Sequence, residues 1–143
     1  MKLLIFILLS IPVAFSFWNQ IVGVRGKLTC NSRVLQDATV SLIERNLIGS
    51  DVILAENKTN FRGIFEVIGR GRGLFDMTVD LKLFHDCTDR QIQCQRIVNL
   101  RIPSSYIQRG ATVSNYFEVG AMDMALWYPD EHRSCSGDYE RLF

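Results

Sequence analysis

The segment Phe75–Cys87 constrains the fold more than any other stretch of the chain. Apolar side chains occupy every second position from Phe75 to Leu83, and polar side chains occupy the positions between them. This period of two predicts a β-strand with one dry and one wet face, because successive side chains of a strand point to opposite faces of the sheet. The dry face of such a strand needs a second sheet to cover it. The chain is therefore predicted to be a sandwich of two sheets.

Short alternating segments recur along the rest of the chain, with turn-forming residues between them. The predicted strands are Ile21–Cys30, Ala38–Arg45, Asp51–Asn57, Ile64–Gly69 and Cys94–Ile102, followed by a hairpin of Val113–Val119 and Ala121–Tyr128 around Gly120. With the segment above, this makes about eight short strands and no long helix, which is typical of an all-β sandwich.

Three connecting segments carry more specific predictions. The run Arg70-Gly71-Arg72-Gly73 predicts a turn that needs the backbone freedom of glycine. The segment Ser104–Arg109 predicts a helical turn capped by Ser104 or Ser105. The charged tail Pro129–Phe143 is predicted to be peripheral.

The N-terminus has the pattern of a secretory signal peptide. Met1 and Lys2 precede an apolar run of about a dozen residues that ends near the small residues Ala14 and Ser16. The run is shorter than the roughly 20 apolar residues that span a bilayer, so an uncleaved anchor is disfavoured. We expect residues 1–16 to be removed, and residues 17–143 to form one secreted domain.

The chain has four cysteines, Cys30, Cys87, Cys94 and Cys135. An even number in an exported chain predicts two disulfides, whereas a zinc site is disfavoured because no Cys-x-x-Cys pair is present. The sequence allows three pairings. We favour Cys30 with Cys94 and Cys87 with Cys135, because both bonds would then close long loops. No metal and no cofactor are expected.

Charge and composition narrow the possible partners. The chain has 16 basic and 15 acidic residues, so its net charge of +1 gives no reason to expect nucleic acid as a partner. Asn57 begins the triplet Asn-Lys-Thr, which makes it a candidate acceptor for an N-linked glycan.

Seven segments together carry a resemblance to a known family. They are Val24–Cys30, Ala38–Leu42, Asp51–Leu54, Thr59–Gly69, Leu81–Cys87, Ile102–Ile107 and Tyr116–Gly120. In this order they resemble the nematode transthyretin-like family of secreted proteins. The resemblance implies a two-sheet, transthyretin-type (prealbumin-like) sandwich with disulfides, in a family whose members mostly have no assigned role. The family often has a proline in the loop after the first cysteine, and Asn31–Asp37 has none, so the geometry of that loop is not carried over.

Several residues could carry chemistry, and each has a structural alternative. His85 and Cys87 could form a base and a nucleophile, but the even number of cysteines favours a disulfide. His132 could bind a metal or sense pH, although a solvated tail is the simpler reading. Trp127 and Tyr128 could form the wall of a ligand site or could end a core strand.

Arg70 and Arg72 are the candidate ligand contacts. Guanidinium groups beside exposed backbone N–H groups suit a phosphate, although most glycine-rich turns only connect strands.

The sequence predicts a secreted, non-enzymatic binding module that acts at a cell surface or in extracellular fluid. Its ligand would be a receptor, a lipid headgroup or a small apolar molecule. One alternative is a hydrolase that opens 5-hydroxyisourate, but the related enzymes end in Tyr-Arg-Gly-Ser, and this chain ends Glu140-Arg141-Leu142-Phe143. The other alternative is a tetrameric carrier of a hormone-like ligand, which would need that assembly.

Overall fold

The structure is a computed structural model that describes residues 18–88 and 94–135. The predicted signal peptide therefore lies outside the described residues. The strands are β1 (Asn19–Cys30), β2 (Arg33–Val34), β3 (Thr39–Glu44), β4 (Val52–Lys58), β5 (Ile64–Arg72), β6 (Val79–His85), β7 (Cys94–Arg101), β8 (Gln108–Arg109), β9 (Phe117–Asp123) and β10 (Glu131–Cys135). A single 3-10 turn, η1 (Ser104–Tyr106), lies between β7 and β8.

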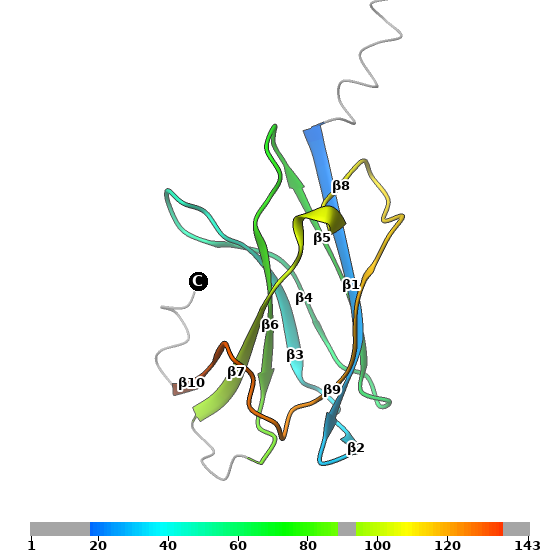
Figure 1. Cartoon of the computed structure of the whole chain (residues 1–143), viewed down its shortest axis with the longest axis vertical. Coiled ribbons are helices and arrows are strands. Elements are labelled where there is room, and N and C mark those ends of the chain that lie inside the picture. The colour runs from blue at the N-terminus through cyan, green and yellow to red at the C-terminus, as the bar shows by residue number, and fades with distance from the viewer. Residues whose placement is uncertain (1–17, 89–93, 136–143) are drawn as a thin grey trace, which may run out of the picture.

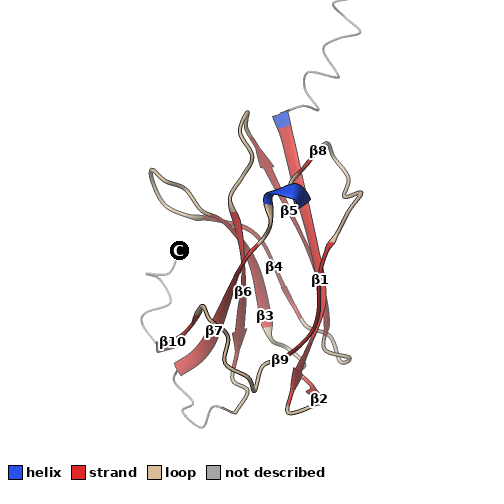
Figure 2. Ribbon diagram, viewed as in Figure 1, coloured by secondary structure: helices blue, strands red, loops and turns tan. Residues whose placement is uncertain are grey.

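The strands form two sheets that face each other (Figure 1). In the first sheet β1 pairs with β2, β5 and β8 in antiparallel fashion and with β9 in parallel. The second sheet has the order β10-β7-β6-β3-β4, and all of its pairs are antiparallel. The nearly complete absence of helix in the described chain is plain in Figure 2, and the prediction of an all-β sandwich is confirmed.

Alternating residues of both sheets form one hydrophobic core. In β1 the inward side chains of Val22, Val24 and Leu28 are completely buried, and they pack with residues of the facing sheet such as Leu42 and Leu81. This arrangement explains why the period of two recurs along the chain, since each strand contributes one face to the shared interior.

The prediction for Phe75–Cys87 is correct in kind but wrong in extent and exposure. The strand β6 begins only at Val79, and Phe75 is 84% exposed in the preceding loop. All seven residues of β6 are buried, including Asp80 and Lys82 on the predicted wet face. The strand β6 is central in its sheet, between β3 and β7, and Asp80 on its outer face pairs with Arg101 of β7 and with Arg45, which follows β3.

The predicted hairpin around Gly120 is wrong. Gly120 lies inside the single strand β9, with a positive φ of 72°. Arg25 pairs with Glu118 and Lys27 with Ala121, so two residues of β9 face one residue of β1. Gly120 therefore makes a β-bulge, where a left-handed backbone favours glycine, and the strand continues instead of turning back.

Two further predictions need correction. The tail is not wholly peripheral, because Glu131–Cys135 forms the edge strand β10 against β7. The helical turn is present as η1, but no side chain caps it, and Pro103 rather than a serine precedes it. The chain then returns to the first sheet through β8, which pairs with the start of β1.

Candidate functional site

The strongest candidate site is a depression of about 390 Å³ at the end of the sandwich where β1 begins. We call it the arginine pocket. It is lined by Asn19, Gln20, Arg70, Gly71, Arg72, Gly110 and Ala111. The structure therefore brings together the two arginines that the sequence singled out, and adds to them the start of β1 and the loop after β8.

Regular strand geometry, not a turn, positions the two arginines. β5 runs on through Arg72, where residues of alternate parity share a face, so Arg70 and Arg72 lie on the same side and are exposed. The prediction of a turn at Arg70–Gly73 is wrong over its first three residues. Gly71 instead leaves room for the side chain of Met77, whose sulfur would lie 2.2 Å from a Cβ atom at this position.

Buried and partly buried polar side chains hold the loop beside this pocket. Gln20 is 1% exposed, and its amide nitrogen donates to the carbonyl oxygen of Phe75 at 2.9 Å while its oxygen accepts the N–H of Met77 at 2.9 Å. Arg109 donates to the carbonyl oxygen of Gly73 at 2.6 Å and to the carboxylate of Asp76 at 2.8 Å. These hydrogen bonds hold one wall of the pocket in a fixed conformation, which suits a binding site.

Arg70 differs from Arg109 in its surroundings. Within the described residues, the side chain of Arg70 has neither an ion pair nor a hydrogen bond, and it is exposed. The acidic side chain of the loop after β5, Asp76, pairs with Arg109 at 2.8 Å. The guanidinium of Arg70 is therefore available to an anion from solution.

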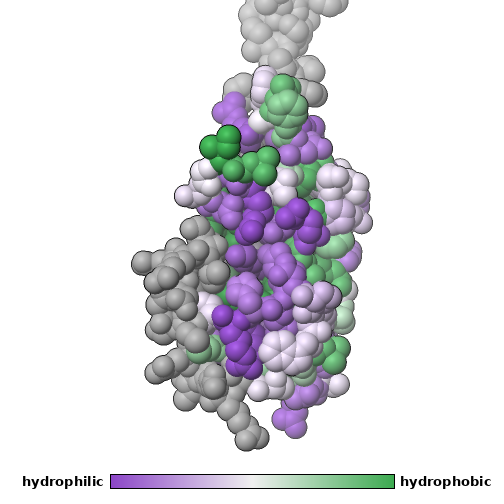
Figure 3. Space-filling view, turned by 60° about the vertical axis from the view of Figure 1, so that its left-hand side comes forward, coloured by the Kyte–Doolittle hydropathy of each residue, from purple (hydrophilic) through white to green (hydrophobic). Residues whose placement is uncertain are grey.

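Exposed apolar side chains project from two loops of the molecule. Leu74 and Phe75 are 51% and 84% exposed beside the arginine pocket, and Leu47 and Ile48 at the tip of the β3–β4 hairpin are almost fully exposed. Figure 3 shows hydrophobic residues at the upper end of the face turned forward, above a hydrophilic band that follows the long axis. Sequence reading missed this contrast because loop residues were judged only as connections.

The charged residues on the outer face of the second sheet form a network of ion pairs. The carboxylate of Asp80, 1% exposed, pairs with Arg101 and lies 3.5 Å from the guanidinium of Arg45. Asn99 also donates to Asp80, at 3.3 Å. Burial, and then the charge of Arg45, lower the pKa of Lys82. This network supports the sheet.

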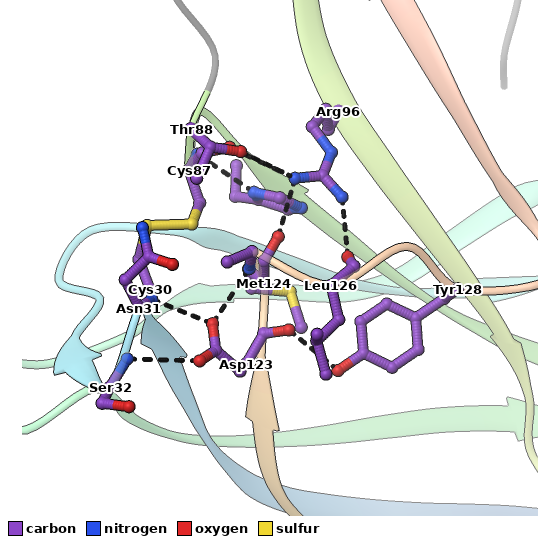
Figure 4. The surroundings of a disulfide bond; sticks show 12 residues. Cys30, Asn31, Ser32, Cys87, Thr88, Arg96, Asp123, Met124, Leu126 and Tyr128 are labelled. Carbon is purple, nitrogen blue, oxygen red and sulfur yellow. Dashed lines mark hydrogen bonds between the residues drawn. A yellow bond between two sulfur atoms is a disulfide. The ribbon is translucent and has the colours of Figure 1, made fainter.

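The opposite end of the sandwich holds the disulfide Cys30–Cys87, whose Cα atoms are 5.7 Å apart (Figure 4). The favoured pairing of Cys30 with Cys94 and Cys87 with Cys135 is therefore wrong. Loop length was a poor guide, because the ends of β1 and β6 already lie side by side across the two sheets. Cys94 is also disulfide-bonded, and the β7–β10 register places the backbone of Cys135 opposite it.

Arg96 organises this disulfide end. It is 1% exposed and forms a buried ion pair with Glu131. Its guanidinium donates to the carbonyl oxygens of Met124 at 2.7 Å and Leu126 at 2.8 Å, and to that of Cys87 at 3.2 Å. Figure 4 shows these bonds converging from the loop after β6 and from the loop after β9. Sequence analysis missed this residue, because nothing local distinguishes a buried arginine from an exposed one.

The aromatic pair Trp127 and Tyr128 belongs to the same loop and does not end a strand. Trp127 is 64% exposed, and its ring centroid lies 4.1 Å from the guanidinium carbon of Arg96, a cation–π contact. The hydroxyl of Tyr128 donates to the carbonyl oxygen of Asp123 at 3.0 Å. The ring of Trp127 therefore covers the guanidinium group of Arg96.

The structure keeps His85 and Cys87 in contact, but it does not leave Cys87 as a free thiol. Cys87 is in a disulfide and cannot act as a thiolate nucleophile. His85 is buried, and its Nδ1 accepts the N–H of Cys87 at 3.1 Å. His132 is exposed on β10 and, by strand parity, lies on the other face of the sheet. The part of the chain described contains no cluster of three metal-binding side chains.

Asn57 is exposed on β4, close to the neighbouring strand β5. Its amide nitrogen donates to the carbonyl oxygen of Glu66 at 2.9 Å. Thr59, the third residue of the triplet, is 2% exposed, and its hydroxyl donates to Leu35 O at 2.6 Å and accepts the N–H of Ala38 at 3.0 Å. A glycan would therefore have to be added before this part of the chain folds.

No helix in the described ranges has the length and apolar character needed to cross a membrane.

Comparisons with known proteins give consistent results. The sequence profile of the transthyretin-like family matches residues 25–103. Transthyretin-like protein 5 of Caenorhabditis elegans is 36% identical over 137 residues, covering 94% of this chain and 99% of that protein. Transthyretin-like protein 33 of the same organism is 32% identical over 92% of each chain. Transthyretin-like protein 2 is 29% identical, over 82% of this chain and 83% of that protein.

Proposed function

The chain belongs to the transthyretin-like family, and we propose that it is a secreted, non-enzymatic module that binds an anionic ligand in the arginine pocket. It would act in extracellular fluid or at a cell surface. The signal-like segment Met1–Ser16 and the Cys30–Cys87 disulfide support secretion, because disulfides persist mainly in oxidising compartments.

The observation that carries the binding proposal is the exposed guanidinium of Arg70 on a fixed wall. The neighbouring Arg109 is committed to Gly73, Leu74 and Asp76, so the loop does not need Arg70 for its own stability. A guanidinium fork binds phosphate and carboxylate groups through parallel N–H···O bonds. The ligand class is thus a phosphate-bearing anion, either a lipid headgroup or a soluble phosphate.

The binding test compares two double variants of equal charge. Arg70→Gln with Arg72→Gln should weaken binding of inorganic phosphate, followed by NMR titration, by at least about tenfold. Arg33→Gln with Arg62→Gln removes two exposed arginines outside the pocket and should leave binding unchanged. Equal losses of phosphate affinity in the two double variants would show that binding depends only on net charge, and would overturn the proposal.

A second experiment tests whether the bound phosphate belongs to a lipid headgroup or to a soluble ligand. The natural protein is mixed with vesicles of phosphatidylcholine alone and with vesicles that also contain phosphatidylserine. Co-sedimentation only with the anionic vesicles, lost in Arg70→Gln with Arg72→Gln, indicates a headgroup ligand. Phosphate binding without vesicle binding indicates a soluble ligand, and absence of both would contradict the proposal.

Secretion and the lack of enzyme activity have their own tests. Expressed in insect cells, the protein should appear in the medium with Phe17 or a near neighbour as its first residue, and Met1 retained on exported protein would refute cleavage. Purified protein should leave the spontaneous opening of 5-hydroxyisourate unchanged. An acceleration that His85→Asn abolishes would favour the hydrolase instead.

A further inference from the structure

A second cavity, of about 340 Å³, opens between β7 and β9 at the edge of the sandwich. We call it the seam cavity. It is lined by Leu100, Arg101, Phe117, Glu118, Val119, Met122 and Tyr128. Most of these side chains are carbon-rich, and they come from both sheets and from the loop after β9.

The seam cavity lies on one side of the sandwich, where residues of β7 and β9 come together. On the opposite edge, the amide of Asn57 on β4 donates to the carbonyl oxygen of Glu66 on β5, which draws the sheets together. On the β7–β9 edge, the side chains of Leu100, Phe117 and Val119 pack against the core yet remain partly exposed. The cavity is therefore an extension of the hydrophobic core, where a bound apolar molecule would take the place of water.

The two charged residues at the rim are already neutralised by partners in the protein. Arg101 pairs with Asp80, and the carboxylate of Glu118 lies 2.7 Å from the guanidinium of Arg25. Inside, burial raises the pKa of Tyr128, so its phenol is neutral. Its hydroxyl hydrogen is used by the carbonyl oxygen of Asp123, which leaves the phenol oxygen as an acceptor for one donor from a ligand.

We propose that the seam cavity binds one small, uncharged, mainly hydrocarbon molecule with a single hydroxyl group. The apolar walls select the hydrocarbon body, the paired rim charges give a carboxylate no counter-ion, and Tyr128 accepts the hydroxyl. This site is separate from the arginine pocket and does not depend on the function proposed for that pocket.

The test uses the neutral fluorescent probe N-phenyl-1-naphthylamine with the natural protein. The probe should bind saturably, one molecule per chain, with a rise in fluorescence. Decanol should displace it at a concentration at least about tenfold lower than decanoate, because burying an unpaired carboxylate is costly. Displacement by decanoate at equal or lower concentration would overturn the uncharged class of ligand.

Two variants locate the site. Leu100→Trp fills the cavity from β7 and should weaken probe binding by at least about tenfold. Leu74→Trp adds the same side chain to an exposed loop and should leave the affinity unchanged. Unaltered binding in a folded Leu100→Trp protein would place the probe elsewhere and would refute the proposal.

A measurement on the natural chain covers the case in which Leu100→Trp fails to fold. With methyl-labelled methionine, decanol should shift the NMR signal of Met122, which lines the cavity, and leave that of Met77 unchanged. Equal shifts of both, or none, would contradict the proposal. If probe binding instead weakens as protein concentration rises, a second copy of the chain covers the cavity, and the small-molecule assignment fails.

Discussion

Arg96 and Arg70 lie at opposite ends of the same sandwich, and their side chains have opposite surroundings. Arg96 is 1% exposed, forms a buried ion pair with Glu131 and donates to three backbone carbonyl groups. Arg70 is exposed and makes no such bond within the described residues. The disulfide end uses its arginine for stability, whereas the other end leaves one for a ligand. Substitutions should therefore affect stability at one end and binding at the other.

The largest effect is expected from removing the disulfide Cys30–Cys87. Its sequence separation of 57 corresponds to a loop-closure term of about 4 kcal/mol in the free energy of unfolding. The double variant Cys30→Ser with Cys87→Ser should lose an amount of this order in urea denaturation. The double variant Arg70→Gln with Arg72→Gln should change stability by less than about 0.5 kcal/mol, because surface substitutions rarely do more.

Peptide mapping without reduction checks the premise of this prediction. It should return Cys30 joined to Cys87, and Cys94 joined to Cys135, whose backbones are opposite each other in β7 and β10. A peptide that joins Cys30 to Cys94 would contradict the described fold of this end.

Arg96→Met should cost about 3 kcal/mol, because it leaves the carboxylate of Glu131 buried without its partner. The matched control is Arg25→Met, which breaks an ion pair whose side chains are 44% and 57% exposed and should cost less than about 1 kcal/mol. Chemical denaturation of both variants measures the difference. Equal losses in the free energy of unfolding would show that the buried ion pair of Arg96 stabilises the protein no more than the exposed ion pair of Arg25.

A smaller difference in stability is expected between substitutions of Asn57 and Thr59, the first and third residues of the glycan triplet. Thr59→Ala removes a buried hydroxyl that joins two loops near the disulfide end, and should cost about 1.5 kcal/mol. Asn57→Gln should change the stability of unglycosylated protein by less than about 0.5 kcal/mol. Both variants should abolish any mass shift on enzymatic deglycosylation. A Thr59→Ala protein as stable as Asn57→Gln would argue against the buried hydrogen bonds.

The smallest effect concerns pH. Backbone N–H donors, first that of Ala125 and then those of Asn31 and Ser32, lower the pKa of Asp123 below its ordinary value of 3.8. A carboxyl whose folded pKa is lowered adds stability above its unfolded pKa, and that stability is lost as pH falls through the folded pKa. Asp123→Asn should therefore reduce stability at neutral pH and flatten the decline on acidification. An unchanged slope between about pH 5 and 2 would exclude this contribution.

The local alternation of apolar and polar residues was enough to predict the two-sheet fold and most strands. The buried face of each strand is visible in its own sequence as apolar residues at every second position. This pattern can be recognised without knowing which strand pairs with it. The sequence also singled out Arg70 and Arg72 as ligand contacts, but it placed them in a turn, whereas in the structure they share one face of β5. The even number of cysteines likewise predicted disulfides.

Only the tertiary structure shows which strands pair and which distant side chains come into contact. The parallel pairing of β9 with β1, the Cys30–Cys87 bond and the burial of Arg96 join residues far apart in the chain. No local pattern encodes such contacts, because the residues next to an arginine in the sequence do not show whether its side chain will be buried. The bulge at Gly120 shows the same limit: glycine signals a positive φ, but only the partner strand determines whether the chain turns back or continues.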